Sequence, residues 1–203
     1  MEASITFKSV GKTVGNKTLL ADLSFGAEKG TTFVLIGENG SGKSLILKLL
    51  VGLIEKDTGS VYIHGQDIQT RSLETRSLCG YMSQFINLDD ELTVKQNISI
   101  HGQLHGMSAK EAKDSTLHWA ELLDILPYLN HYPHKLAYGL QRKVLFARGL
   151  VHDPQVILLD EPTTGMDPQS RSAVWNVLDK LHYNKTIIFA TQNFTEAERY
   201  ADR

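Results

Sequence analysis

The sequence is poor in cysteine, in excess charge and in long apolar runs, and each shortage excludes a class of protein. The single cysteine, Cys79, cannot form an internal disulfide, which is typical of proteins kept in a reducing cytosol. The net charge of −2 does not favour binding to nucleic acid or to an acidic membrane surface. No stretch approaches the roughly 18 consecutive apolar residues that cross a bilayer, and the first residues lack the pattern of a signal peptide. If the protein acts at a membrane, we expect a partner to span it.

The length and composition suit one large domain with a packed core. Hydrophobic residues make up 41% of the 203 residues and charged residues 22%, so there is enough apolar material for a sizeable core. Alternating apolar residues predict strands over residues 4–10, 18–25 and 60–63, which we expect to form a hairpin-rich β layer. Continuous apolar runs at residues 155–159 and 186–190 are typical of buried parallel strands.

Helical spacing appears in other stretches. One predicted helix buries four residues on a single face, Ile46, Leu49, Leu50 and Leu53. Residues 93–130 are rich in helix formers, and Ser108 with Glu111 predicts a capping box there. We interpret this section as a helical subdomain inserted into an α/β core. A further helix is expected from about residue 169, whereas residues 68–80 are polar and predicted to be irregular.

One glycine-rich stretch carries the strongest chemical signal. It matches the pattern G-x-x-x-x-G-K-[ST] through Gly37, Glu38, Asn39, Gly40, Ser41, Gly42, Lys43 and Ser44. An apolar run precedes it and a predicted helix follows it, which is the context that makes this pattern credible. Glycines let backbone N–H groups approach phosphate oxygens, and the following helix N-terminus favours the same anion. We therefore predict a phosphate-binding loop in which Lys43 reaches the β- and γ-phosphates and Ser44 binds Mg²⁺.

Two adjacent carboxylates, Asp160 and Glu161, directly follow the apolar run at residues 155–159. The carboxyl ends of parallel strands are where open α/β folds bind ligands, so this pair is expected near the phosphate-binding loop. Asp160 is then suited to hold Mg²⁺ on the same side as Ser44. Glu161 is placed to polarise a water for in-line attack on the γ-phosphate. The alternative interpretation is that Asp160 and Glu161 only cap a helix. The presence of a phosphate-binding loop in the same chain disfavours it.

The ordered motifs together resemble the nucleotide-binding domain of ATP-binding-cassette (ABC) transporters. Besides the loop and the carboxylates, they are Gln84, residues 136–142 and residues 165–168. The resemblance covers nearly the whole chain and implies an α/β P-loop NTPase fold of ABC type, with a RecA-like parallel-sheet core, an N-terminal antiparallel β layer and an inserted helical subdomain. Residues 92–97, 105–108, 150–154 and 163–168 look most similar to export-type cassettes of the ABC-2, drug-exporter or haem-exporter kind.

The resemblance also implies how one cassette, residues 1–203, is divided. Residues 1–84 would hold the β layer and the first part of the core, and residues 85–150 the helical subdomain with the Q-loop and the signature. Residues 151–203 would complete the core. Because the family continues with further strands, we expect the domain to extend beyond the end of this chain.

Roles for single residues follow from the same resemblance. Gln84 corresponds to the Q-loop glutamine, which joins Ser44 and Asp160 in sensing Mg²⁺ and touches the transmembrane partner. Asp167 matches the D-loop aspartate, which crosses to the opposing protomer. The family binds ATP between two cassettes, so the phosphate-binding loop of one faces the signature of the other, here Leu136, Ala137, Tyr138, Gly139 and Leu140.

Three departures from the family pattern bear on the mechanism. Ala137 replaces the signature serine, which removes a hydrogen bond to a charged group worth roughly 1.5–3 kcal/mol. Gln192 stands where the family has its switch histidine, and an amide cannot carry a proton or a positive charge near neutral pH. Val14 stands where many relatives place an aromatic ring under adenine. The resemblance therefore predicts ATP binding with slow hydrolysis.

The functional prediction is an ATP- and Mg²⁺-dependent ATPase subunit of an ABC exporter. It would act at the cytoplasmic face of the membrane, held there by a transmembrane permease subunit, and would close onto a second nucleotide-binding domain, identical or different. One alternative is a degenerate cassette that binds ATP as a regulatory or assembly module. Another is a non-transport ABC ATPase acting on nucleic acid, which the near-neutral charge disfavours, and a plain P-loop kinase would leave residues 134–143 and 163–168 unexplained.

Several histidines invite a metal-site interpretation that the sequence does not favour. His101 and His105 are four residues apart, the spacing of a two-histidine metal site on a helix. Without a third ligand nearby, we expect two solvated side chains, and we expect the same of His131 and His134.

The aromatic residues are predicted to serve in packing or at a surface. Trp119 and Trp175 lie in helical stretches and are predicted to pack inside. Phe85 and Ile86 follow Gln84, and two alternatives stay open for them: an exposed apolar surface for a partner helix, or burial under the helical subdomain.

Overall fold

The computed structural model describes residues 3–181 and 183–202, which form two compact units. Within the described residues, the first unit comprises 3–81, 155–161 and 183–202, and the second comprises 82–154 and 162–181. No helix in these residues is long and apolar enough to cross a membrane.

An antiparallel sheet opens the first unit, with strand order β2-β1-β4-β5. Its strands are β1 (Ala3–Val14), β2 (Lys17–Glu28), β4 (Thr58–Ile63) and β5 (Gln66–Asp67). A tight turn joins β1 to β2, and Gly15 adopts a φ of +59° there, a conformation that glycine enters without steric cost. All three strand pairs are antiparallel, which confirms the predicted β layer.

A second sheet has strand order β3-β8-β7-β6. Its strands are β3 (Thr32–Ile36), β8 (Thr186–Thr191), β7 (Val156–Asp160) and β6 (Cys79–Met82). β8 pairs in parallel with both β3 and β7. Every residue of β7 and β8 is buried, as expected from their continuous apolar runs. The residues that follow β3, β7 and β8 therefore emerge at one edge of this sheet.

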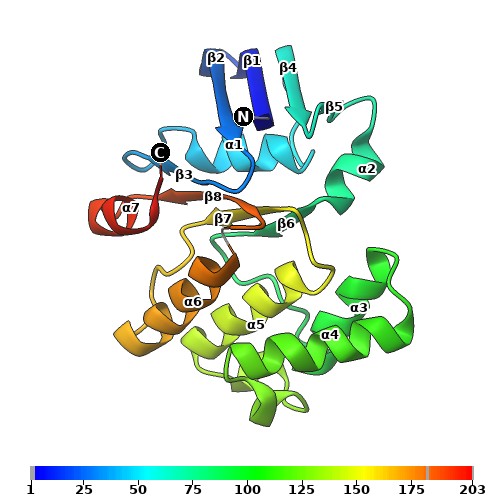
Figure 1. The fold of residues 1–203 in the computed structure, drawn as a ribbon. Coiled ribbons are helices and arrows are strands. Elements are labelled where there is room, and N and C mark those ends of the chain that lie inside the picture. The colour runs from blue at the N-terminus through cyan, green and yellow to red at the C-terminus, as the bar shows by residue number, and fades with distance from the viewer. Residues whose placement is uncertain (1–2, 182, 203) are drawn as a thin grey trace. The chain divides into compact units, whose positions relative to one another are not determined.

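Helix α1 (Lys43–Leu50) lies between the two sheets of the first unit (Figure 1). Its Leu47, Leu49 and Leu50 belong to a core cluster that both sheets share. In the same cluster Phe7 stacks on Phe25 with ring centroids 4.5 Å apart, and Phe25 stacks on Phe33 at 5.2 Å.

The prediction that Leu53 lies on the buried face of α1 is wrong. The helix ends at Leu50, and Gly52 follows with a φ of +67°. The N–H of Leu53 bonds the carbonyl of Lys48, and the N–H of Gly52 bonds that of Leu49, which together form a Schellman motif. The chain turns there, so Leu53 leaves the helical period and is 65% exposed.

The prediction of an irregular segment over residues 68–80 is also wrong, since it contains α2 (Ser72–Ser77). Asp67 starts the turn before it, because its carboxylate accepts hydrogen bonds from the N–H groups of Gln69 and Thr70. Glu74 in the first turn and Arg76 in the last suit the helix dipole. Helix α7 (Phe194–Tyr200) ends the described part of this unit.

The second unit is helical. It contains α3 (Val94–Leu104), α4 (Ala109–Leu122), α5 (Tyr138–Leu150) and α6 (Pro168–Leu181), with short 3₁₀ turns at Leu126–Tyr128 and Pro133–Lys135 (Figure 1). Capping boxes begin α3 and α4, and the box of Ser108 and Glu111 confirms the prediction. Trp119 and Trp175 are buried, as predicted.

We expect Phe7→Ala to lower the free energy of unfolding by about 3–5 kcal/mol, because it removes a ring that is 2% exposed and stacked in the core. The matched control is Phe194→Ala, whose ring is 74% exposed and which should change stability by less than about 0.5 kcal/mol. Urea denaturation of both variants measures the difference. Equal losses would contradict the assignment of Phe7 to the core.

Candidate functional site

The phosphate-binding loop, Gly37–Ser44, connects β3 to α1 in the first unit. Gly40 and Gly42 adopt φ values of +81° and +94°, and Gly42 is the N-cap of α1. A Cβ atom on Gly37 would lie 2.9 Å from Oγ of Ser41. The loop is thus held in a conformation that side chains at these positions would obstruct, and it leads into a helix N-terminus that favours anions.

Lys43 folds back across this loop. Its Nζ donates to the carbonyl oxygens of Gly37 at 2.7 Å and Glu38 at 2.9 Å. Although the residue is only 8% exposed, its ammonium group is therefore satisfied by the backbone of the loop. The positive charge is fixed where the pattern of glycines would receive phosphate oxygens.

Ser44 and Asp160 meet at the edge of the parallel sheet. The Ser44 hydroxyl donates to Oδ1 of Asp160 at 2.9 Å. Burial raises the pKa of the Asp160 carboxyl, while the hydrogen bond from Ser44 and the charges of Lys48 and Lys43 oppose the rise. A hydroxyl and a carboxylate in contact are hard oxygen donors, so the pair fits Mg²⁺.

Glu161 begins the chain that leaves β7, in a strained conformation with a φ of +49°. Its N–H bonds the carbonyl of Ala190, which ties it to β8. Gln192, just after β8, donates from Nε2 to Oδ1 of Asn39 at 2.7 Å and to Oε1 of Glu161 at 3.3 Å. One amide group thus links the phosphate-binding loop to the carboxylate predicted to activate water.

Comparison with known families agrees with this geometry. The sequence model of the family described as "ABC transporter" matches residues 20–164, which is most of the chain and includes the loop and both carboxylates. The chain belongs to the ABC transporter family. It is an ATP-binding cassette of that family, and the family's nucleotide is ATP.

Curated relatives support the same assignment. The chain is 38% identical over 202 residues to the Nod factor export ATP-binding protein I of Burkholderia lata, covering 99% of this chain and 66% of the relative. It is 36% identical over 203 residues to the protein of the same name from a Rhizobium species, covering 100% of the chain and 67% of that relative. The chain thus spans about two thirds of the length of these relatives.

Solved structures confirm the fold class, an α/β P-loop NTPase of ABC type. An ATP-binding subunit of an ABC transporter superposes with a TM-score of 0.90 at 25% identity, over 98% of this chain and 83% of that one. The cassette MJ0796, described as dimeric in a post-hydrolysis state bound to ADP and Pi, gives a TM-score of 0.89 at 26% identity, over 98% and 91%.

The predicted signature, Leu136–Leu140, and Asp167 lie together in the second unit of the cassette. Ala137 is the N-cap of α5 and has no side-chain capping bond. A Cβ atom on Gly139 would lie 3.4 Å from Oδ2 of Asp167. Asp167 accepts a hydrogen bond from the N–H of Ser170 at 2.9 Å, and its hydrogen bonds with Ser170 lower the pKa of its carboxyl.

The structure also gives the positions of two other predicted site residues. Val14 is the last residue of β1 and is 58% exposed at the turn into β2. Gln84 lies in the second unit, and its predicted part in binding Mg²⁺ with Ser44 and Asp160 stays a prediction, as does the contact of Val14 with adenine. Beside Gln84, the ring of Phe85 is 76% exposed, which favours the exposed alternative for that residue.

Arg142 is a residue whose role sequence reasoning missed. It is fully buried in α5, and its guanidinium donates to the carbonyls of Ser83 and Gln84 at 2.9 and 2.8 Å and to that of Pro162 at 2.9 Å. It therefore fixes the backbone of Ser83 and Gln84, the predicted Q-loop, to the segment that leads to Asp167. The available signal was an arginine two residues before the apolar run 144–147, since a charge near such a run that becomes buried needs partners.

The prediction that His101 and His105 are two solvated side chains without a third ligand is wrong. Both are half-buried, and His152 lies beside them because the fold brings the end of α5 to α3. His131 and His134 are exposed, as predicted.

We expect Arg142→Met to lower the free energy of unfolding by at least about 2 kcal/mol, because it leaves buried carbonyls without their charged donor. The control Arg199→Met removes an exposed arginine of α7 that only faces the Tyr200 ring, and should cost less than about 1 kcal/mol. Chemical denaturation followed by circular dichroism compares the two. A cost for Arg142→Met no larger than the control's would contradict the structural role.

Proposed function

We propose that this cassette binds and hydrolyses ATP as a subunit of an exporter, acting through a separate transmembrane partner at the cytoplasmic face of the membrane. The observation that carries the proposal is the single sheet edge where the phosphate-binding loop, Asp160, Glu161 and Gln192 meet through side-chain hydrogen bonds. Curated relatives named as export ATP-binding proteins support the transport role.

Binding of ATP uses the loop first. Its N–H groups and the N-terminus of α1 would bind phosphate oxygens, and Lys43 would exchange the carbonyls of Gly37 and Glu38 for them. Ser44 and Asp160 would hold Mg²⁺, which neutralises phosphate charge when bound. The exposed Val14 is the proposed neighbour of adenine.

Hydrolysis would depend on Glu161 and Gln192. Glu161 is 6% exposed and receives the amide of Gln192, so its carboxylate is oriented by a fixed donor. A carboxylate held this way can accept the proton of an attacking water. Gln192 positions Glu161 and offers its amide to phosphate, but it carries no charge, so turnover would be slow.

The site would be completed by a second cassette. The signature Leu136–Leu140 and Asp167 share one unit, and α5 starts there, so its N-terminal N–H groups are available for a phosphate. Solved structures of the cassette MJ0796, described as dimeric, support pairing with a second cassette. Gln84 is the proposed link to Mg²⁺ and to the transmembrane partner, with the exposed Phe85 beside it.

A regulatory cassette that binds ATP with little hydrolysis is the second candidate. It is favoured by the bare N-cap at Ala137, where no hydroxyl is present, and by the neutral amide at Gln192. The two candidates differ in one measurable quantity, the rate of phosphate release that depends on Glu161.

We expect Glu161→Gln to lower ATP-dependent phosphate release by about 10²–10⁴-fold while ATP binding changes little, because the variant keeps the shape of the side chain but loses its base. Phosphate release and binding of a fluorescent ATP analogue are measured on the same samples. The control is Glu198→Gln on the exposed face of α7, which should match the original protein. Identical background rates for both variants would exclude hydrolysis and leave the regulatory candidate.

We expect Gln192→His to raise the rate of phosphate release by roughly 10–100-fold, because a protonated imidazole adds a charge-assisted hydrogen bond worth about 1.5–3 kcal/mol in the transition state. The increase should fade above the imidazole pKa, since the neutral ring loses the charge. A pH profile of phosphate release for both proteins measures it. An unchanged or lower rate at every pH would show that Gln192 is not what limits turnover.

A further inference from the structure

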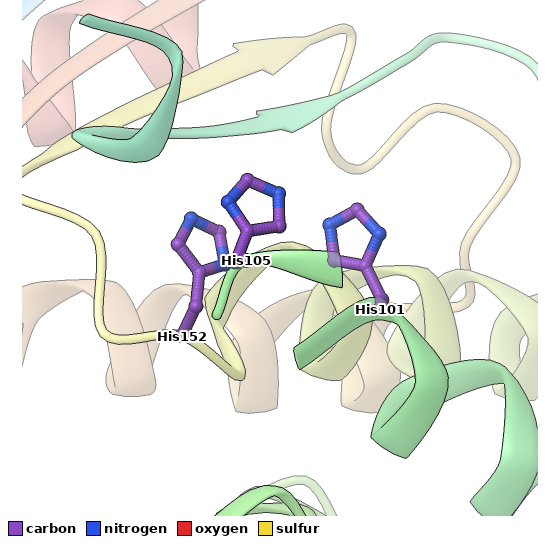
Figure 2. A group of neighbouring side chains, drawn as sticks. All are labelled: His101, His105 and His152. Carbon is purple, nitrogen blue, oxygen red and sulfur yellow. The ribbon is translucent and has the colours of Figure 1, made fainter. Parts of the chain in front are cut away.

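Three histidines gather in the second unit, and none of them is among the residues assigned above to ATP. His101 lies on α3, His105 caps the end of the same helix, and His152 follows α5 (Figure 2). One ring nitrogen from each lies within 4.8 Å of the others. The ring centroids of His105 and His152 are 3.7 Å apart, and that of His101 is 4.8 Å from His105 and 5.8 Å from His152.

The backbone around this histidine cluster holds it together. His101 and His105 are four residues apart and share one face of α3. Gly102 between them allows close packing, since a Cβ atom there would lie 3.4 Å from Cγ1 of Val151, the residue before His152. The Ser115 hydroxyl of α4 also donates to the carbonyl of Val151 at 2.6 Å. The third histidine is therefore positioned by main-chain packing and not by a flexible loop.

Burial favours the neutral, metal-binding form of two of the rings, His101 and His105. Burial, followed by the charges of His105, Arg148 and His152, lowers the pKa of His101 to about 3, and burial lowers the pKa of His105. Both imidazoles are neutral at physiological pH, which is the state that ligates. The charge of Arg148 opposes a cation here, and the main-chain and side-chain oxygens of Asn87 hold its guanidinium in place without neutralising it.

We propose that His101, His105 and His152 form a binding site for a divalent transition-metal ion, with Zn²⁺ the best match. Imidazole nitrogens suit Zn²⁺, Cu²⁺ and Ni²⁺ and not Mg²⁺, so this site does not compete for the ion expected at Ser44 and Asp160. A tetrahedral Zn²⁺ with Zn–N bonds of about 2.0–2.1 Å needs nitrogens about 3.4 Å apart. The rings would close by at most roughly 1.4 Å, and a water would take the fourth position. Binding would clamp the end of α3 to the turn after α5.

The direct test measures Zn²⁺ affinity on the untagged, nucleotide-free chain in excess Mg²⁺, by competition with a chromophoric chelator. We expect one equivalent to bind tightly. His101→Gln, His105→Gln and His152→Gln should each weaken binding at least about tenfold, because loss of a ligand costs no less than loss of its outer partner. The control is His118→Gln, an exposed histidine of α4, which should bind as the original chain does. Affinity that is unchanged in His152→Gln, or lost equally in the control, overturns the proposal.

A second measurement uses the unaltered chain, so it stands even if a variant fails to fold. Co²⁺ replaces Zn²⁺ and gives intense visible bands only in a tetrahedral site. Histidine side-chain NMR then identifies the rings that shift when Zn²⁺ is added. Bands with shifts confined to the three histidines support the site. Shifts at His131 or His134 instead, or no tetrahedral bands, overturn it.

Discussion

Parallel pairing of β8 with its two neighbours is the constraint on which the ATP site of the first unit depends. Ile36 of β3 aligns with Thr191 of β8, and Asp160 of β7 aligns with Ala190. In this register the loop after β3, the carboxylates at the end of β7 and the residue after β8 leave the sheet at one level. Since every residue of β7 and β8 is buried, a shifted register would exchange the side chains packed on the two faces of the sheet and disrupt the core, so packing of the core also aligns the site.

The contacts at this edge explain how a departure from the family pattern is accommodated. Gln192, predicted to stand where the family has its switch histidine, has an amide that links Asn39 of the loop to Glu161. The substitution thus preserves an ordered hydrogen-bond donor while removing a protonatable group. The hydrogen-bond geometry at residue 192 is therefore independent of its charge, so the affinity for ATP and the rate of hydrolysis need not change together.

In the second unit, the residues of interest lie on helix α5 or at its two ends. Ala137 starts α5 near Asp167, Arg142 in the same helix binds the carbonyls of Ser83 and Gln84, and the turn after that helix carries His152. Each feature depends on the placement of α5 against its neighbours. A single well-packed helix therefore contributes to the predicted signature, to the backbone around Gln84 and to the histidine cluster.

The sequence by itself determined those parts of the structure that depend on interactions between residues close together in the chain. The loop Gly37–Ser44, the carboxylates after a buried run, the capping box at Ser108 and the alternating strands all depend on neighbours a few residues away. The burial of Leu53 was predicted wrongly because the spacing of apolar residues does not show where the helix ends. The helix ends before Leu53, since Gly52 adopts a positive φ. The meeting of His152 with His101, and the carbonyls that receive Arg142, were decided only by tertiary structure, because packing between distant segments selects such partners and no period in the sequence encodes them.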